Sequence, residues 1–376
     1  MATESVEVVV IGAGQSGVCL SYFLQKRGVR HLVLEKATAF SAWEQRWDSF
    51  RMNTPNWMNE IPGAPQRFAP GSGRSEIGTG ADALEYFGAY LSSVGPPLRE
   101  HTEVTRVRQL AGGLWSVETP ETTYECRGVA ICTNPYPAAK IPDVAGDLSS
   151  GVVQVHSSEF RNAQQIAPGP VLVVGSGSSG VQICEDLARS GRFSEVYLAV
   201  SGNGTLPWKV AGVPTYTLLR FFGMLGLRRG SLRGRVLQRM FSGREGDFST
   251  PPKPEELRRR YVVRLVGKVA AVHDGALQCD DGASVPMDGL TVVWATGFKA
   301  SYDFIEVGNS GTLLDDHGDV LHDRGVSFAA PGLCFVGLRF QSTVASRFIN
   351  GVGRDAEYVA SHLATLVKAE TTAVRC

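Results

Sequence analysis

We predict an α/β fold with two Rossmann-like domains, and three features of the 376-residue sequence support this prediction. The first is a strand, a glycine-rich loop and a helix in succession near the N-terminus. The second is the return of the same succession, with its loop beginning at Gly175 instead of Gly12. The third is an apolar content of 43%, which suffices for two to three domains of ~150 residues and argues against disorder.

The charge balance and the cysteines narrow the classes of protein. Lys+Arg and Asp+Glu both number 37, so no basic excess favours nucleic acid as a partner. The seven cysteines form no Cys-x-x-Cys pair, which disfavours a disulfide framework, a metal site and a redox dithiol. We expect reduced thiols, no bound metal and a cytoplasmic protein. We also expect no signal peptide and no transmembrane segment, because residues 1–7 carry no basic region and the apolar runs are short.

The first glycine loop has the full context of a dinucleotide-binding site. Residues 6–11 form a β-branched run typical of a buried parallel strand, residues 12–17 read GAGQSG, and residues 18–26 show helical spacing. The next strand ends at Glu35, which is placed to accept hydrogen bonds from a ribose. Because an acid there repels a 2′-phosphate, FAD or NAD is favoured over NADP at this loop.

Each glycine of this loop has its own expected task. Gly12 permits the tight turn, Gly14 lets a pyrophosphate approach the backbone, and Gly17 lets the helix pack closely on the strand. The N-terminus of the helix adds unpaired N–H groups and a positive dipole end. The other contacts predicted here are Gln15, Ser16 and Lys36.

The second loop repeats this arrangement without the acid. Residues 171–174 form an apolar strand, residues 175–180 read GSGSSG, and a helical pattern follows over 181–189. The strand after it, 196–200, runs into Ser201, so nothing there repels a 2′-phosphate, and Lys209 is the nearest cation. NADP is therefore favoured over NAD, with NADH as the alternative. The predicted contacts are Gly175, Gly177, Ser178, Ser179, Gly180, Ser201 and Lys209.

The remaining sequence alternates strand and helix patterns. Residues 81–91 and the closing segment after 336 are predicted helices, and residues 216–241 are predicted to hold one or two more. The short arginine run at 258–260 is interpreted as a solvated helix face. The further predicted strands are 104–110, 115–119, 128–132, 291–295 and 333–336.

Four segments outside the loops are distinctive: WEQRWDSFRMNTPNW (43–57), HSSEFRN (156–162), ATG (295–297) and the block that begins GLCFVGLRFQ (332–360). Together with the two loops, they resemble the flavin-containing monooxygenase superfamily, in particular its short bacterial members called CzcO-like flavoproteins. The resemblance extends along nearly the whole chain.

The resemblance implies a discontinuous FAD domain, residues 1–150 and 290–376, with an inserted NAD(P) domain, residues 151–289. It also implies that NADPH reduces the flavin and that reduced flavin transfers one atom of O₂ to a small organic molecule. The oxygenated position would be a nitrogen, a sulfur or the carbon beside a carbonyl.

The resemblance further implies which side chains lie beside the cofactors. Asn53 would hydrogen-bond the oxygen adduct of the flavin, and His156 would contact the nicotinamide or orient the linker. Gln341 is the third catalytic candidate. The alternatives are turn capping for Asn53, core packing for the tryptophans and a structural hydrogen-bonded role for His156. The other expected contacts are Trp43, Trp47, Trp57, Val104, Thr296, Gly297 and Arg347.

Residues 205–265 match the family least and are predicted to hold a substrate cap. An apolar cluster with flanking arginines stands out there: Arg220, Phe221, Phe222, Met224, Leu225 and Arg228. A cap lining a tunnel, a membrane-surface helix and an ordinary packing face all fit this pattern.

For the whole chain, two alternatives to a monooxygenase stay open. One is an FAD-dependent oxidase or dehydrogenase that transfers no oxygen, and the other is a non-catalytic redox sensor. A homodimer is the oligomer considered.

Overall fold

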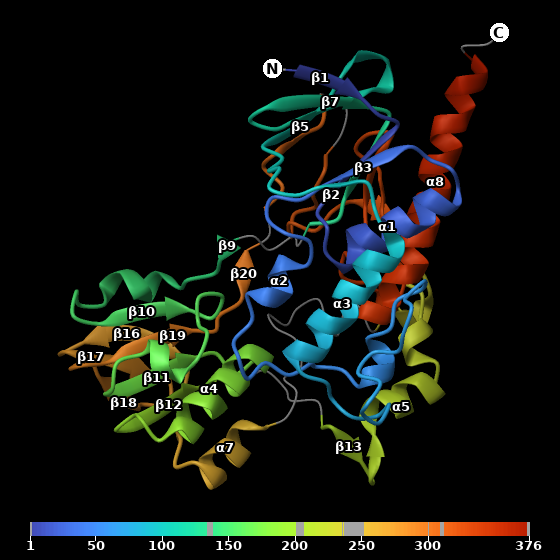
Figure 1. Ribbon diagram of the computed structural model, residues 1–376. Coiled ribbons are helices and arrows are strands. Elements are labelled where there is room, and N and C mark those ends of the chain that lie inside the picture. The colour runs from blue at the N-terminus through green and yellow to red at the C-terminus, as the bar shows by residue number, and fades with distance from the viewer. Residues whose placement is uncertain are drawn as a thin grey trace.

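Two α/β units lie side by side in the computed structural model, which describes residues 2–133, 138–200, 207–234, 236, 252–299, 301–308 and 312–373. Each unit is built on a parallel sheet, so the α/β prediction with two Rossmann-like domains is confirmed (Figure 1).

The first unit has a seven-stranded sheet, and the first glycine loop lies at the end of β2, the middle one of its five parallel strands. All neighbours from β24 to β4 pair in parallel, whereas β22 and β23 pair antiparallel at one edge. In sheet order the strands are β22 (His322–Asp323), β23 (Val326–Ser327), β24 (Leu333–Phe335), β8 (Gly128–Ile131), β2 (Val8–Ile11), β3 (His31–Leu34) and β4 (Leu98–Arg99).

Both faces of β2 are buried, which explains its uninterrupted apolar run. Val8 and Val10 pack in the core below the helices, whereas Val9 and Ile11 pack against a second sheet. The helices are α1 (Gln15–Lys26), α3 (Gly80–Val94) and α8 (Val352–Ala373). The second sheet contains, in order, β1 (Ala2–Ser5), β7 (Thr122–Cys126), β6 (Trp115–Glu118), β5 (Arg106–Gln109) and β21 (Ile305–Glu306).

The second unit repeats this three-layer arrangement around the second loop. Val171 and Val173 face the helix α4 (Ser178–Ser190), and Leu172 and Val174 face a small antiparallel sheet. The parallel sheet contains β10 (Val153–His156), β19 (Thr291–Trp294), β11 (Pro170–Val174), β12 (Glu195–Ala199) and β15 (Arg264–Val266). The small sheet contains β16 (Val269–His273), β17 (Ala276–Cys279) and β18 (Ser284–Pro286).

The position of β19 corrects the sequence-based boundary at residue 290. β19 pairs in parallel with both β10 and β11, so the parallel sheet of the second unit extends to Trp294. A short TVVW run fits a parallel strand in either unit, and only the pairing register decides between them. The chain crosses between the units at the antiparallel pair of β9 (Ala138–Ala139) and β20 (Phe298–Lys299).

The predicted helices 18–26, 81–91 and 181–189 occur as α1, α3 and α4, each beginning one to three residues earlier than predicted. Within the predicted segment 216–241, residues 235 and 237–241 lie outside the described residues. The exposed arginines 258–260 end α7, as predicted. Among the residues described, no helix combines the length and apolarity needed to cross a bilayer.

Shorter elements complete the fold. The helices are α2 (Ser41–Glu44), α5 (Thr215–Phe221) and α7 (Pro254–Arg260), and a hairpin joins β13 (Lys209–Val210) to β14 (Val213–Pro214). The 3₁₀ helices are η1 (Asn56–Met58), η2 (Ala111–Gly113), η3 (Asp143–Asp147), η4 (Ala163–Gln165), η5 (Met224–Gly226), η6 (Val344–Arg347) and η7 (Ile349–Gly351).

Stability is expected to fall with acid because of His322, on β22. Burial and the neighbouring Arg229 lower the pKa of His322 from 6.5 to about 4. A lowered pKa in the folded state means that stability is present above pH 6.5 and is lost as the pH falls towards 4, by roughly 3 kcal/mol. Urea unfolding of the wild type and of His322→Asn across this range checks the prediction.

The variant is matched because an asparagine Oδ1 can replace His322 Nδ1 as the acceptor for the Gly325 N–H, at 3.0 Å. The variant should lose less stability in acid than the wild type. If the free energy of unfolding fell equally with pH in the two proteins, His322 would not be the cause of the acid sensitivity.

Candidate functional site

The first glycine loop is held tight by backbone contacts. Gly12 has φ +100°, a left-handed conformation that favours glycine, and its N–H donates to Leu34 O at 2.8 Å. A Cβ at Gly17 would lie 1.8 Å from Gly12 O. The turn therefore closes directly onto the first turn of α1.

The middle of the same loop is open. Gly14 precedes α1 in extended conformation, no side chain caps it, and a Cβ there would meet nothing within 4 Å. The first turn of α1 contains no acid, whereas α3 begins with a capping box formed by Thr79 and Asp82. An uncapped helix N-terminus beside open space is suited to a phosphate.

Glu35 lies beside this opening, as predicted from its spacing. Its carboxylate accepts the N–H of Ala13 at 2.8 Å and that of Ala37 at 3.1 Å. Each carboxylate oxygen can accept a further hydrogen bond, so the group both shapes the loop and can bind a ribose hydroxyl. Lys36 is exposed next to it.

One predicted contact, Trp43, lies against the loop from another part of the chain. Gln15 Oε1 accepts a hydrogen bond from Trp43 Nε1 at 3.2 Å, which brings this tryptophan to the start of α1. The chain after β24 also reaches the loop, because a Cβ at Gly337 would lie 2.6 Å from Ser16 Oγ. Val104 is half-buried farther along, two residues after Thr102, whose N–H donates to Glu35 O.

The second loop reproduces this geometry. Gly175 has φ +110°, and a Cβ at Gly180 would lie 1.8 Å from Gly175 O. Gly177 precedes α4 without a side-chain cap, and a Cβ there would again meet nothing within 4 Å. Ser178 and Ser179 form the first turn of α4, which contains no acid. A second phosphate cradle therefore lies in the second unit.

Ser201 and Lys209 are the two residues predicted to contact the nicotinamide dinucleotide from beyond α4. Ser201 lies outside the described residues. Lys209 is exposed on the β13–β14 hairpin, which lies beside α5, apart from the start of α4 (Figure 1). The predicted roles of Ser201 and Lys209 stay predictions.

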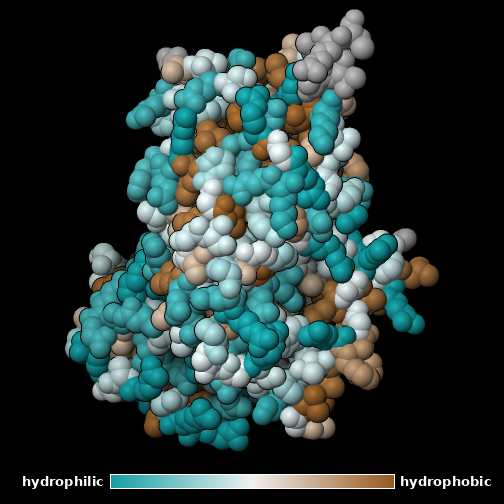
Figure 2. All heavy atoms as spheres, turned by 45° about the vertical axis from the view of Figure 1, so that its right-hand side comes forward, coloured by the Kyte–Doolittle hydropathy of each residue, from teal (hydrophilic) through white to brown (hydrophobic). Residues whose placement is uncertain are grey.

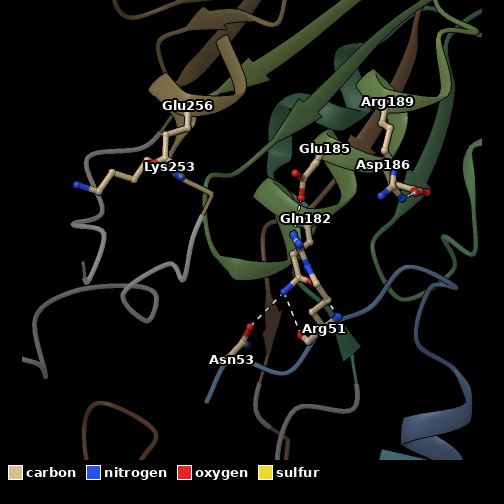
Figure 3. A network of polar contacts seen from close by, with 8 residues as sticks. All are labelled: Arg51, Asn53, Gln182, Glu185, Asp186, Arg189, Lys253 and Glu256. Atoms are coloured by element: carbon tan, nitrogen blue, oxygen red, sulfur yellow. Dashed lines mark hydrogen bonds and ion pairs between the residues drawn. The ribbon is translucent and has the colours of Figure 1, made fainter. Parts of the chain in front are cut away.

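A polar clamp that the sequence did not predict joins the two units. Gln182, on α4, accepts the N–H of Arg51 at 2.9 Å and donates to Arg51 O at 3.1 Å and to Asn53 Oδ1 at 3.3 Å. Glu185, one turn later, pairs with the Arg51 guanidinium. Figure 3 shows both α4 side chains pointing at the Arg51–Asn53 segment. Asn53 is therefore held from the second unit.

The segment before Arg51 is tied to the second unit as well. The Asp48 N–H donates to Arg161 O at 2.8 Å, and Asn162 Nδ2 donates to Asp48 Oδ2 at 2.7 Å. Trp47, the residue before Asp48, is 3% exposed, and its indole N–H has no protein acceptor among the described residues. A buried donor without a partner indicates a place for a bound group.

His156 is fully engaged at the crossover between the units. Its Nδ1 accepts the Ser158 N–H at 3.2 Å, so Nε2 carries the proton and donates to Gly297 O at 3.0 Å. Burial lowers the pKa of His156, which disfavours the protonated ring. These hydrogen bonds hold the ring at the crossover between the units, and both predicted roles of His156 stay predictions.

Thr296 and Gly297 belong to the same crossover. Thr296 Oγ1 donates to Lys140 O, and Gly297 O also accepts the Lys140 N–H at 2.9 Å. These residues follow β19, which lies in the parallel sheet of the second unit. Their expected place in the first unit is thereby corrected.

Gln341 is hydrogen-bonded within the turn after β24, and its predicted catalytic role stays a prediction. It is 1% exposed, and its amide oxygen accepts the N–H groups of Gly337 and Leu338. Its amide nitrogen donates to Arg324 O and Phe335 O. These four bonds use the whole capacity of the amide, which fixes the turn after β24. Arg347 lies in η6, and its side chain is outside the description.

Within the described part of the chain, no group of three or more His, Cys, Asp or Glu side chains is arranged to hold a metal ion. The six described cysteines are free and buried. Burial raises the pKa of each of these thiols, so none is poised as a thiolate.

Comparisons with known proteins agree with this geometry. Residues 9–212 match the family model described as pyridine nucleotide-disulphide oxidoreductase. An uncharacterized CzcO-like oxidoreductase from Geobacillus kaustophilus is 30% identical over 94% of this chain and 97% of its own length.

Two solved structures share the fold at lower identity. The flavin-containing monooxygenase from Stenotrophomonas maltophilia is 23% identical with a TM-score of 0.73, over 96% of this chain and 99% of that chain. A structure of OTEMO in complex with FAD and NADP is 18% identical with a TM-score of 0.67, over 98% of this chain and 86% of that chain. With a family match over more than half its length and a relative aligned along almost all of it, the chain belongs to the pyridine nucleotide-disulphide oxidoreductase family.

Proposed function

We propose that this oxidoreductase is a flavin-dependent monooxygenase that binds FAD at the first loop and NADPH at the second, and that uses O₂ to oxygenate a small organic molecule. The observation that carries the proposal is the pair of open cradles at Gly14 and Gly177, one in each unit. The names of the similar structures, a flavin-containing monooxygenase and a complex with FAD and NADP, support it.

The residues present fit the two dinucleotides. At the first loop, Gly12, Gly14 and Gly17 would hold the FAD pyrophosphate, and Glu35 would hold its ribose. At the second loop, Gly175–Gly180 would hold the pyrophosphate of NADPH, with no acid to repel its 2′-phosphate. When bound, the flavin accepts electrons from the nicotinamide and passes them to O₂.

The chain itself supplies position and exclusion of water. The clamp from Gln182 holds Asn53 in place, so its amide can keep one orientation towards the flavin side of the first unit. Trp43 lies at the start of α1, and the buried Trp47 brings an unused N–H donor to the same segment. These contacts place polar donors on a rigid frame between the units.

Thiol chemistry is disfavoured although the family description includes disulphide reduction. Every described cysteine is buried, and its raised pKa opposes formation of the nucleophilic thiolate. Free thiols also support the proposed cytoplasmic location.

The purified protein is expected to show the visible absorbance of bound flavin and to oxidise NADPH faster than NADH. A panel of amines, thioethers and ketones should contain a substrate that raises NADPH oxidation and lowers the peroxide released per NADPH. The product should contain one oxygen atom from ¹⁸O₂.

Two outcomes would overturn the proposal in different ways. Stoichiometric peroxide with every compound and no oxygenated product would indicate an oxidase. Flavin that the nicotinamide reduces, but whose turnover no compound stimulates, would indicate the flavin/nicotinamide redox sensor.

A further inference from the structure

A second candidate surface lies on residues 207–236, outside both glycine loops. Four large apolar side chains are exposed there, Phe221 at 81%, Phe222 at 69%, Leu232 at 81% and Val236 at 58%. Two valines of the adjoining hairpin, Val210 and Val213, are 46% and 40% exposed. Figure 2 shows apolar surface gathered at the lower right of the face it presents. We call these six residues the apolar patch.

The opposite side of the segment that contains the patch packs against the first unit. Tyr216 and Leu225 are each 7% exposed and pack in a cluster with the fully buried Met58 of the first unit. Arg220 also lies over the ring of Trp57, 5.0 Å from its centroid. The predicted apolar cluster is thus divided, with Leu225 inside and the two phenylalanines outside. Side chains held outward on a packed element mark an interaction surface.

The charge around the patch is one-sided. Residues 207–236 contain six Lys or Arg and no Asp or Glu, although the whole chain is neutral. Of the cations described, Lys209, Arg220, Arg228 and Arg233 are exposed. A groove of about 390 Å³ beside Phe222 is lined by Met224, Leu227, Leu232, Arg233 and Val236. The surface therefore combines aromatic and aliphatic side chains with positive charge.

We propose that the apolar patch docks the protein onto the surface of an anionic phospholipid bilayer. Exposed phenylalanines and leucine would enter the boundary between headgroups and acyl chains, while the arginines would contact anionic headgroups. The attachment is peripheral, because α5 has seven residues and no described helix could span a bilayer. A second copy of the chain fits less well, since a two-fold contact would set these cations against each other.

The test is flotation of the full-length, flavin-loaded protein with two kinds of vesicle, phosphatidylcholine alone and phosphatidylcholine mixed with phosphatidylglycerol. The protein should float with the mixed vesicles and dissociate as salt is raised. Phe221→Ser/Phe222→Ser should lower the partition coefficient by roughly tenfold or more, since two buried rings are lost. Lys209→Glu/Arg233→Glu should lower it several-fold at low salt.

Matched controls separate the patch from general surface properties. Leu232→Ser is compared with Val262→Ser, which changes another exposed aliphatic side chain, 90% exposed at the end of α7 in the second unit. Arg258→Glu/Arg259→Glu, on the exposed end of α7, changes the net charge by the same amount as Lys209→Glu/Arg233→Glu. Both controls should float like the wild type, and flavin absorbance and thermal unfolding should show that all variants are folded.

Several results would overturn the proposal. Equal flotation with both vesicle types, or none with either, would do so, as would equal losses in the patch variants and their controls. Sedimentation of a larger species that Phe221→Ser/Phe222→Ser disperses, without vesicle binding, would assign the patch to a second copy. Salt-sensitive binding of RNA or DNA without vesicle binding would assign it to nucleic acid.

Discussion

Gly17→Ala is expected to abolish flavin incorporation and to lower the free energy of unfolding by about 3–5 kcal/mol. The new methyl group would lie 1.8 Å from Gly12 O, which is a backbone atom that no rotamer change can move. Relief requires opening the turn or lifting α1 from β2, and either change destroys the phosphate cradle. Flavin absorbance relative to protein and urea unfolding measure the two effects.

Gly14→Ala is the matched control within the same loop. A Cβ at Gly14 would meet no protein atom within 4 Å, so folding should change by less than about 1 kcal/mol. The same methyl would stand where the pyrophosphate approaches, and flavin affinity should fall although the protein stays folded. If Gly14→Ala bound flavin as tightly as the wild type, FAD would not lie at this cradle. Normal stability of Gly17→Ala would contradict the loop geometry.

Gln182→Leu is expected to uncouple the two units. Gln182 is 4% exposed, and leucine of similar size would leave the N–H and C=O of Arg51 and the Oδ1 of Asn53 without this partner. The loss of these bonds should destabilise the protein by about 1–3 kcal/mol. Reduction of the flavin by NADPH should slow by roughly tenfold, because the geometry between the units is no longer held. Stopped-flow absorbance and urea unfolding measure these changes.

The control for this variant lies on the same helix. Asp186 pairs with Arg189 one turn later, at 3.2 Å, and that pair faces away from the clamp (Figure 3). Asp186→Asn should therefore change stability by no more than about 0.5 kcal/mol and leave flavin reduction unchanged. Indistinguishable behaviour of the two variants would show that the clamp has no functional weight.

Local patterns were sufficient for the two loops. A β-branched run followed by GAGQSG and a helical repeat specifies a strand, a turn and a helix within 20 or so residues, and each step has a local steric cause. Glu35 could be placed beside the first loop for the same reason, because the length of one helix and one strand sets its distance along the chain. The open space at Gly14 and Gly177 follows from this local geometry.

Where a local pattern fits more than one strand pairing, the sequence did not predict strand bounds and sheet membership correctly. Residues 6–11 read as one strand, but β1 (Ala2–Ser5) pairs with β7 in the second sheet and β2 begins at Val8. β19 fits either unit by its composition and was placed in the wrong one. A polar side chain after a buried strand predicts a site rim for Gln341, and the structure adds that its amide fixes the turn after β24.

The sequence by itself determined the α/β class, the two phosphate loops and the acid that accompanies the first, because these depend on contacts between neighbours along the chain. The tertiary structure alone decided that β19 belongs to the parallel sheet of the second unit. It also decided that Gln182 holds Arg51 and Asn53. Finally, it decided that Phe221 and Phe222 face outward. The partners in the clamp are about 130 residues apart in the chain, and their pairing depends on how two separately formed units pack. Local periodicity does not predict that packing. The sequence pattern around a glutamine on the buried face of a helix is the same whether its side chain contacts the core or a neighbouring domain.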